Sequence, residues 1–151
     1  MKKEFSAGGI VFKKFDPAKS GTKFEIKWLV CQHSQHKGWV FPKGFIGDHI
    51  VGESKEDTAL REVKEETGVI GKIITMLSNP VSYFYSWKDE KRFKTVYYFL
   101  MEYKGGDIQK HDFEMSAVEW WTEEKVKKDL TYKADKDAFD EALKLMGELK
   151  S

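Results

Sequence analysis

The sequence predicts an α+β fold built on a mixed β-sheet, and three observations support this class. Strand-like and helical segments come in the order strands, helix, strands, helix, which differs from the regular alternation of a doubly wound fold. With 151 residues, of which 40% are hydrophobic, residues 1–151 are sufficient to bury a core as a single domain. The third observation is the apolar run Phe93–Tyr103, the strongest strand signal in the chain.

Strands are expected where apolar and β-branched residues alternate or cluster between turn-forming residues. These segments are Phe5–Phe12, Phe24–Gln32, Trp39–Phe41, Val69–Ser78, Val81–Trp87, Phe93–Tyr103 and Ala117–Trp121, with a charged turn at Lys88–Arg92. The pair Gly8 and Gly9 inside the first segment indicates a bulge or a close approach of the backbone to another part of the molecule.

The segment Ser54–Thr67 is expected to form a helix, with Ser54 as its N-cap and Gly68 as its C-terminal stop. Acidic residues in its first turn suit the helix dipole. Two further helices are expected near the C-terminal end, at Glu123–Leu130 and Asp135–Leu149.

The composition argues against several function classes. The 26 basic and 25 acidic residues nearly cancel, so no overall positive field indicates a nucleic-acid partner. No apolar run approaches the ~20 residues that span a bilayer, and no secretory signal is recognisable. The one cysteine, Cys31, excludes a disulfide scaffold, and its apolar neighbours indicate a small buried hydrophobe. We therefore expect a cytoplasmic protein without a membrane partner, either a monomer or a homodimer.

Three glutamates of the predicted helix, Glu62, Glu65 and Glu66, share one helix face. At 3.6 residues per turn, Glu66 lies about 40° from Glu62, and Glu65 lies about 60° away on the other side. Like charges at these spacings repel by roughly 0.2–0.5 kcal/mol per pair in an isolated helix. A hard cation such as Mg²⁺ takes oxygen ligands and would turn this repulsion into binding. The alternative is a solvated acidic face, with Arg61 and Lys64 as ordinary surface partners.

The wider spacing favours the metal site. Five residues separate Gly47 from Glu53, and seven separate Glu53 from Arg61. The chain then reads Arg-Glu-Val-Lys-Glu-Glu-Thr-Gly-Val up to Val69. This pattern resembles the signature of the Nudix hydrolase family: glycine, five residues, glutamate, seven residues, then Arg-Glu-aliphatic-X-Glu-Glu-X-Gly-aliphatic.

The resemblance implies a mixed α/β/α sandwich with the signature as a loop-helix-loop, and a metal-dependent hydrolase that cleaves phosphoanhydride bonds in nucleoside polyphosphates. It implies that Glu62, Glu65 and Glu66 ligate Mg²⁺ or Mn²⁺. The carbonyl of Gly44 would be a further ligand.

The same resemblance implies catalytic roles for other acids. Arg61 would orient an acid of the signature, Glu53, rather than contact substrate. A metal-activated water would attack phosphorus in line, and a glutamate would take its proton. The general base would be either Glu62 or Glu114, since the family is not uniform on this point.

The loop before the helix departs from the family pattern. There, a Pro-Lys-Gly run usually flows straight into the signature, so that its glycine is the first signature position. Here Gly44 is followed by eight residues before Glu53, whereas Gly47 has the required five. Either Gly47 is the first glycine or the loop is three residues longer, and the intact Phe41–Gly44 run favours the longer loop.

Residues outside the signature resemble the asymmetric bis(5′-nucleosyl)-tetraphosphatases. The similar runs are Phe41–Gly44, Phe93–Met101 and Asp129–Tyr132. In that subgroup a lysine, a histidine and tyrosines hold phosphates, and aromatic rings stack on adenine. The resemblance implies substrate-binding roles, each with an ordinary surface or core role as its alternative, for Lys43, Lys94, Tyr132, Tyr85 and either His33 or His36.

Three functions remain open at this point. The first is asymmetric hydrolysis of diadenosine tetraphosphate to ATP and AMP. The second is hydrolysis of another phosphoanhydride, such as a nucleoside triphosphate, ADP-ribose, an RNA 5′ end or a diphosphoinositol. The third is a sensor that binds nucleotide without turnover, which the intact set of signature acids argues against.

Overall fold

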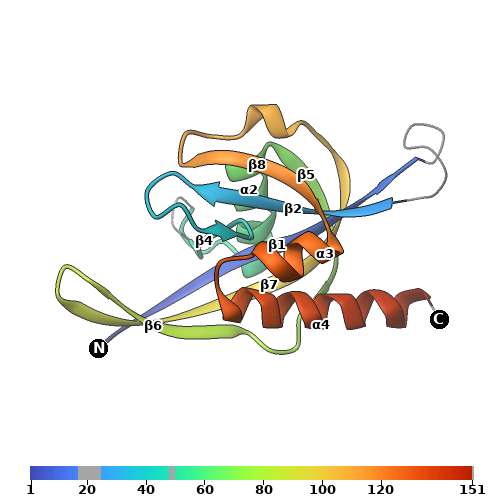
Figure 1. Cartoon of the computed structure of the whole chain (residues 1–151). Helices are drawn as coiled ribbons and strands as arrows, with labels where there is room; N and C mark the ends of the chain where they lie inside the picture. The colour runs from blue at the N-terminus through green and yellow to red at the C-terminus, as the bar shows by residue number, and fades with distance from the viewer. Residues whose placement is uncertain (17–24, 48–49, 151) are drawn as a thin grey trace.

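The computed structural model describes residues 1–16, 25–47 and 50–150, and within them the strands join one mixed sheet (Figure 1). The main path of the sheet runs β3–β2–β1–β7–β5, while β4 pairs with β1, β6 with β7, and β8 with β2. The strands are β1 (Lys2–Phe15), β2 (Glu25–His33), β3 (Trp39–Val40), β4 (Lys43–Phe45), β5 (Val69–Met76), β6 (Val81–Trp87), β7 (Glu90–Gly106) and β8 (Met115–Thr122). The expected α+β class with a mixed sheet is confirmed.

One parallel pairing, between β1 and β7, makes the sheet mixed. It runs from Lys2 opposite Arg92 to Phe12 opposite Glu102. The other pairings are antiparallel, including the β6–β7 hairpin. In Figure 1 this hairpin extends away from the helices, beside the N-terminal end of β1.

Helices cover both faces of the sheet. Helix α2 (Lys55–Thr67) packs on one face, and α3 (Glu123–Asp129) and α4 (Lys133–Lys150) pack on the other (Figure 1). Side chains alternate between the two cores, as the pleat requires. Trp28 and Val30 of β2 contribute to the α3/α4 side, whereas Leu29 and Cys31 contribute to the α2 side.

Local capping defines α2 as the sequence predicted. The Ser54 hydroxyl accepts a hydrogen bond from the Asp57 amide at 3.1 Å. Gly68 ends the helix in the left-handed conformation, with φ 80°, and its amide donates to the Lys64 carbonyl. The start and end of the acid-bearing helix are therefore fixed by residues beside it in the sequence.

One local prediction was wrong, and one strand was missed. The charged turn expected at Lys88–Arg92 is only Lys88 and Asp89, whose φ values of 50° and 62° are positive, and β7 already begins at Glu90. The strand β4 was not expected, because its three residues form a strand only by pairing with β1. The close approach indicated by Gly8 is confirmed at this pairing, since a Cβ there would collide with the Pro42 carbonyl oxygen.

Cys31 is fully buried, as expected of a small hydrophobe, and burial raises the pKa of its thiol well above the usual value. Of the adjacent tryptophans on β8, Trp121 is buried while Trp120 is half-buried. Among the described residues no helix has the length and apolar character needed to cross a membrane. The cytoplasmic location stays a prediction.

Candidate functional site

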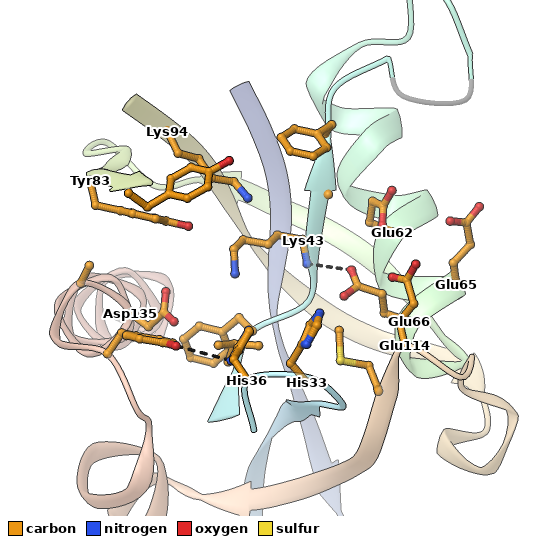
Figure 2. Close-up of a pocket in the computed structure, with 18 of the residues that line it drawn as sticks. His33, His36, Lys43, Glu62, Glu65, Glu66, Tyr83, Lys94, Glu114 and Asp135 are labelled. Atoms are coloured by element: carbon orange, nitrogen blue, oxygen red, sulfur yellow. Dashed lines mark hydrogen bonds between the residues drawn. The ribbon is translucent and has the colours of Figure 1, made fainter. Parts of the chain in front are cut away.

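A cavity of about 940 Å³ opens between the loop after β2, strand β4, the acid-bearing face of α2, the β6–β7 hairpin and the start of α4 (Figure 2). Most of the residues that the sequence singled out line it. They are His33, His36, Lys43, Gly44, Glu62, Glu65, Glu66, Tyr85, Lys94, Glu114 and Tyr132.

Two glutamates of α2 form the acidic wall of the cavity. Glu62 and Glu66 are only 7% and 4% exposed. Burial raises the pKa of Glu66 well above its usual value, and the neighbouring Glu62 carboxylate raises it further. Burial also raises the pKa of Glu62, although Arg61 opposes this shift. The two buried carboxylates thus repel each other, and a cation bound on their cavity side would relieve this repulsion.

Strand β4 holds this pair from the other side. The Lys43 amide donates a hydrogen bond to Oε2 of Glu66 at 3.0 Å. A Cβ on Gly44 would overlap the carboxyl group of Glu62, so only glycine lets the strand lie this close. The backbone of Gly44 is therefore in contact with the acidic wall.

Arg61 is bound to Glu53 through two parallel hydrogen bonds. Its Nε and Nη2 atoms donate to the two carboxylate oxygens of Glu53, each at 2.9 Å. The Thr58 hydroxyl adds a third bond at 2.7 Å, and the Gly47 amide a fourth. The hydrogen bonds from Arg61, opposed by burial, lower the pKa of Glu53 to about 2.

The bonds between Arg61 and Glu53 agree with the expected role of Arg61, which was to orient Glu53 rather than to contact substrate. Neither residue lines the cavity, and a catalytic part for either stays a prediction. The two candidate glycines have separate roles. Gly44 provides the close approach to Glu62, while Gly47, with φ 73°, turns the loop and donates to Glu53.

Glu65 does not join the acidic wall in this conformation. Its side chain is 45% exposed, and Arg61 Nη1 donates to it at 3.2 Å, as it does to Glu62 at 3.0 Å. Consistent with this, no three histidine, cysteine, aspartate or glutamate side chains in residues 1–16, 25–47 and 50–150 are gathered so as to hold a metal ion. The α2 side of the cavity offers carboxylate oxygens, the ligands of a hard divalent cation, so Glu62 and Glu66 fit one, and Glu65 would reach it by rotating away from Arg61.

Two lysines face the cavity from separate strands, Lys43 on β4 and Lys94 on β7 (Figure 2). Burial opposes the charge of both. At Lys43 burial is the largest single influence, but Asp135, Tyr83 and Glu66 together outweigh it, and the pKa is raised. Burial and the nearby Lys43 lower the pKa of Lys94 to about 8. Both amines are therefore charged below that pH, which suits anionic oxygens.

Sequence reasoning missed Asp135 and Tyr83, which face the same space (Figure 2). Asp135 is 6% exposed in the first turn of α4, and the Tyr98 hydroxyl donates to its Oδ1 at 3.2 Å. Tyr83 lies opposite Lys94 in the β6–β7 pairing. Neither belongs to a sequence motif, and only the packing of β6 and α4 around β7 reveals them.

The end of β2 and the loop after it each supply one histidine. The rings of His33 and His36 stack with centroids 4.3 Å apart and planes 9° apart. The Nδ1 atom of each accepts a backbone amide hydrogen bond, from Gln35 and Gly38, so the proton of each neutral ring lies on Nε2. The Tyr132 hydroxyl lies 3.4 Å from Nδ1 of His36. The two imidazole rings and the Tyr132 ring thus form one edge of the cavity.

Tyr85 and Glu114 also line the cavity. The Tyr85 hydroxyl, however, donates a hydrogen bond to Glu4, and burial together with that bond raises the pKa of Tyr85 to about 12. Glu114 is exposed in the segment before β8, with its side chain at the cavity.

Comparison with known proteins identifies a domain type. A model of the NUDIX domain matches residues 19–142. A Mycobacterium tuberculosis (strain CDC 1551 / Oshkosh) protein, provisionally named mutator protein MutT4, is 30% identical over 148 residues, which are 98% of this chain and 58% of that protein. The chain therefore spans less than two thirds of that relative. The asymmetrical bis(5′-nucleosyl)-tetraphosphatase of Rattus norvegicus is 31% identical over 105 residues, 69% of this chain and 68% of that enzyme.

Solved structures agree on the fold. The binary complex of a C. elegans Ap4A hydrolase superposes with a TM-score of 0.71 at 22% identity, covering 96% of this chain and 98% of that one. The NUDIX domain of Shewanella oneidensis NrtR, solved with ADP ribose, gives 0.71 at 25% identity and covers 97% of this chain and 90% of that one.

Proposed function

The chain belongs to the NUDIX family, and from that premise we propose that it is a metal-dependent hydrolase of phosphoanhydride bonds in nucleoside polyphosphates. One observation carries the proposal: the buried carboxylates of Glu62 and Glu66 face the same cavity as the amines of Lys43 and Lys94. Carboxylates bind a hard divalent cation, and lysines bind phosphate oxygens. A metal-bound polyphosphate requires both within one cavity.

Glu62 and Glu66 would hold the cation, with Glu65 and the Gly44 carbonyl as further ligands. Mg²⁺ is the proposed ion and Mn²⁺ the alternative. A bound ion of this kind neutralises phosphate oxygens and lowers the pKa of a bound water. Arg61 would hold the Glu62 carboxylate in position, because it donates hydrogen bonds to both Glu62 and Glu53.

We propose Glu114 as the group that takes the proton from the attacking water. Glu62, the other possibility, is pinned between Arg61 and Gly44 and is committed to the cation. Glu114 is exposed at the cavity and has room to approach a bound water. A general base must come within hydrogen-bond reach of the proton that it abstracts.

Diadenosine tetraphosphate, cleaved to ATP and AMP, is the proposed substrate. The likeness to the rat tetraphosphatase supports it, and so does a cavity that presents two lysines between aromatic residues. ADP-ribose is a second candidate, favoured by the likeness to the NrtR domain solved with that ligand. Both compounds carry phosphoanhydride-linked phosphates between two riboses, but only diadenosine tetraphosphate has a base at each end.

A panel of polyphosphates with Mg²⁺ tests the function directly. We expect chelator-sensitive turnover, with diadenosine tetraphosphate yielding equal amounts of ATP and AMP on a chromatogram. Formation of two ADP would contradict asymmetric cleavage. Faster turnover of ADP-ribose would transfer the assignment to that substrate. Tight nucleotide binding without turnover of any compound would instead identify a sensor.

Substrate binding is expected to weaken at alkaline pH, when the Lys94 ammonium loses its proton. Because its pKa is about 8, Lys94 is charged below that pH and neutral above it. Loss of a charge-assisted phosphate contact weakens binding by roughly tenfold or more. We expect the KM of the wild type to rise by about this factor from about pH 7 to about pH 9.5, while Lys94→Arg, which stays charged, shows a flatter profile. Parallel profiles for the two proteins would remove Lys94 from phosphate binding.

A further inference from the structure

We propose that the ring of Phe45 is the stacking platform for the second nucleobase of a dinucleoside polyphosphate. The inference rests on the proposed function and names the feature that would distinguish a two-base substrate from a one-base substrate. It assigns a role to a residue that belongs to no signature.

The exposure of Phe45 is the first observation. This phenylalanine on β4 keeps 39% of its surface in contact with solvent, although its neighbours Phe41 and Pro42 are buried. Phe45 also lines the cavity. An exposed aromatic surface within a binding cavity is suited to a flat apolar ligand group, and every nucleobase has such a face.

The position of Phe45 in the chain is the second observation. It directly follows Gly44, whose backbone touches the carboxyl group of Glu62. It is also held in register by β1, since the Ile46 amide donates to the Phe5 carbonyl at 3.0 Å and Ser6 lies opposite Phe45. The ring is therefore anchored one residue away from the acidic wall.

The contact with Lys94 is the third observation. Its ammonium lies 4.8 Å from the centroid of the Phe45 ring, in a cation–π arrangement. Lys94 is one of the two lysines that face the cavity. A nucleotide whose base stacks on the Phe45 ring would therefore have its phosphate beside the Lys94 ammonium. The other base would be left for the part of the lining formed by His36 and Tyr132.

The test compares two substrates that differ in one base. Diadenosine tetraphosphate carries two adenines, and adenosine 5′-tetraphosphate carries one. For Phe45→Ala we expect kcat/KM on the two-base substrate to fall about tenfold, with a change within about twofold on the one-base substrate. Phe45→Tyr, which keeps an aromatic ring, should restore the two-base value.

Trp87→Ala is the matched control, since Trp87 is an exposed aromatic residue of β6 with a lysine over its ring at 5.7 Å and lies outside the cavity lining. It should leave both substrates unaffected. An equal fall on the two substrates for Phe45→Ala would overturn the inference, because the ring would then act only through Lys94. A wild type inactive on both compounds would instead overturn diadenosine tetraphosphate as the proposed substrate, and the platform with it.

Discussion

Replacing Glu66 with glutamine is expected to abolish most turnover while making the metal-free protein more stable at neutral pH. The carboxylate is 4% exposed, and its pKa is raised well above 4.5 by burial and by Glu62. A raised carboxyl pKa means that the stability present below about pH 4.5 is lost as the pH rises and the buried charge appears. Glutamine removes that charge, so the stability gain over wild type should be absent near pH 4 and grow toward neutrality.

The activity loss follows from the same charge. Without it the cation would lose an oxygen ligand and its charge compensation, and we expect kcat/KM with Mg²⁺ to fall at least ~100-fold. Thermal unfolding with and without Mg²⁺ supplies the second measurement, in which the metal should stabilise the wild type more than the variant. Glu65→Gln on the same helix is the control, because its exposed side chain should leave the metal-free unfolding temperature nearly unchanged. Retention of turnover by Glu66→Gln would mean that the Glu66 carboxylate is not needed to bind a catalytic cation.

Glu53→Gln is expected to cost about 3 kcal/mol of folding stability at neutral pH, with a secondary loss of activity. Its side chain is 4% exposed and accepts two hydrogen bonds from Arg61, and removing one partner of such a pair leaves the other charge poorly compensated. The pKa of Glu53 is about 2 in the folded protein, below its usual value of 4.5. The stabilisation is therefore present above about pH 4.5 and disappears as the pH falls toward 2.

Urea unfolding across that range measures this prediction. The difference in free energy of unfolding between wild type and Glu53→Gln should shrink steadily between pH 4.5 and pH 2. Glu56→Gln is the matched control, since Glu56 is an exposed acid in the first turn of the same helix. A pH-independent difference would mean that Glu53 contributes through packing rather than through its charge.

Local signals explain why the acidic wall was visible in the sequence. Helix α2 begins and ends at Ser54 and Gly68, which act on the backbone beside them, and helical geometry then places Glu62 and Glu66 together. The same geometry places Glu65 on this face, but it does not predict the partner of the side chain. Arg61, four residues earlier, bonds the Glu65 carboxylate, which stays 45% exposed.

The rest of the cavity depends on contacts between distant segments. Asp135 reaches it because α4 packs on the α3/α4 side of the sheet, and Tyr83 because β6 pairs with β7. Strand β4 exists only against β1, so neither the strand nor the exposure of Phe45 could be predicted from local pattern. The lysines were found through their surrounding motifs, whereas the lowered pKa of Lys94 depends on its burial and on Lys43 from another strand.

The parallel pairing of β1 with β7 sets the order in which the protein can fold. Lys2 cannot pair with Arg92, nor Phe12 with Glu102, until the residues up to Glu102 have been synthesised. Closing so long a loop is entropically costly and slow. Until it closes, the edge of β1 that pairs with β7 has no partner strand. Since β4 rests on β1, and α2 packs against both β1 and β5, the acidic wall is expected to assemble late in folding. Newly made chains would then pass through a stage with formed secondary structure and no capacity to bind metal.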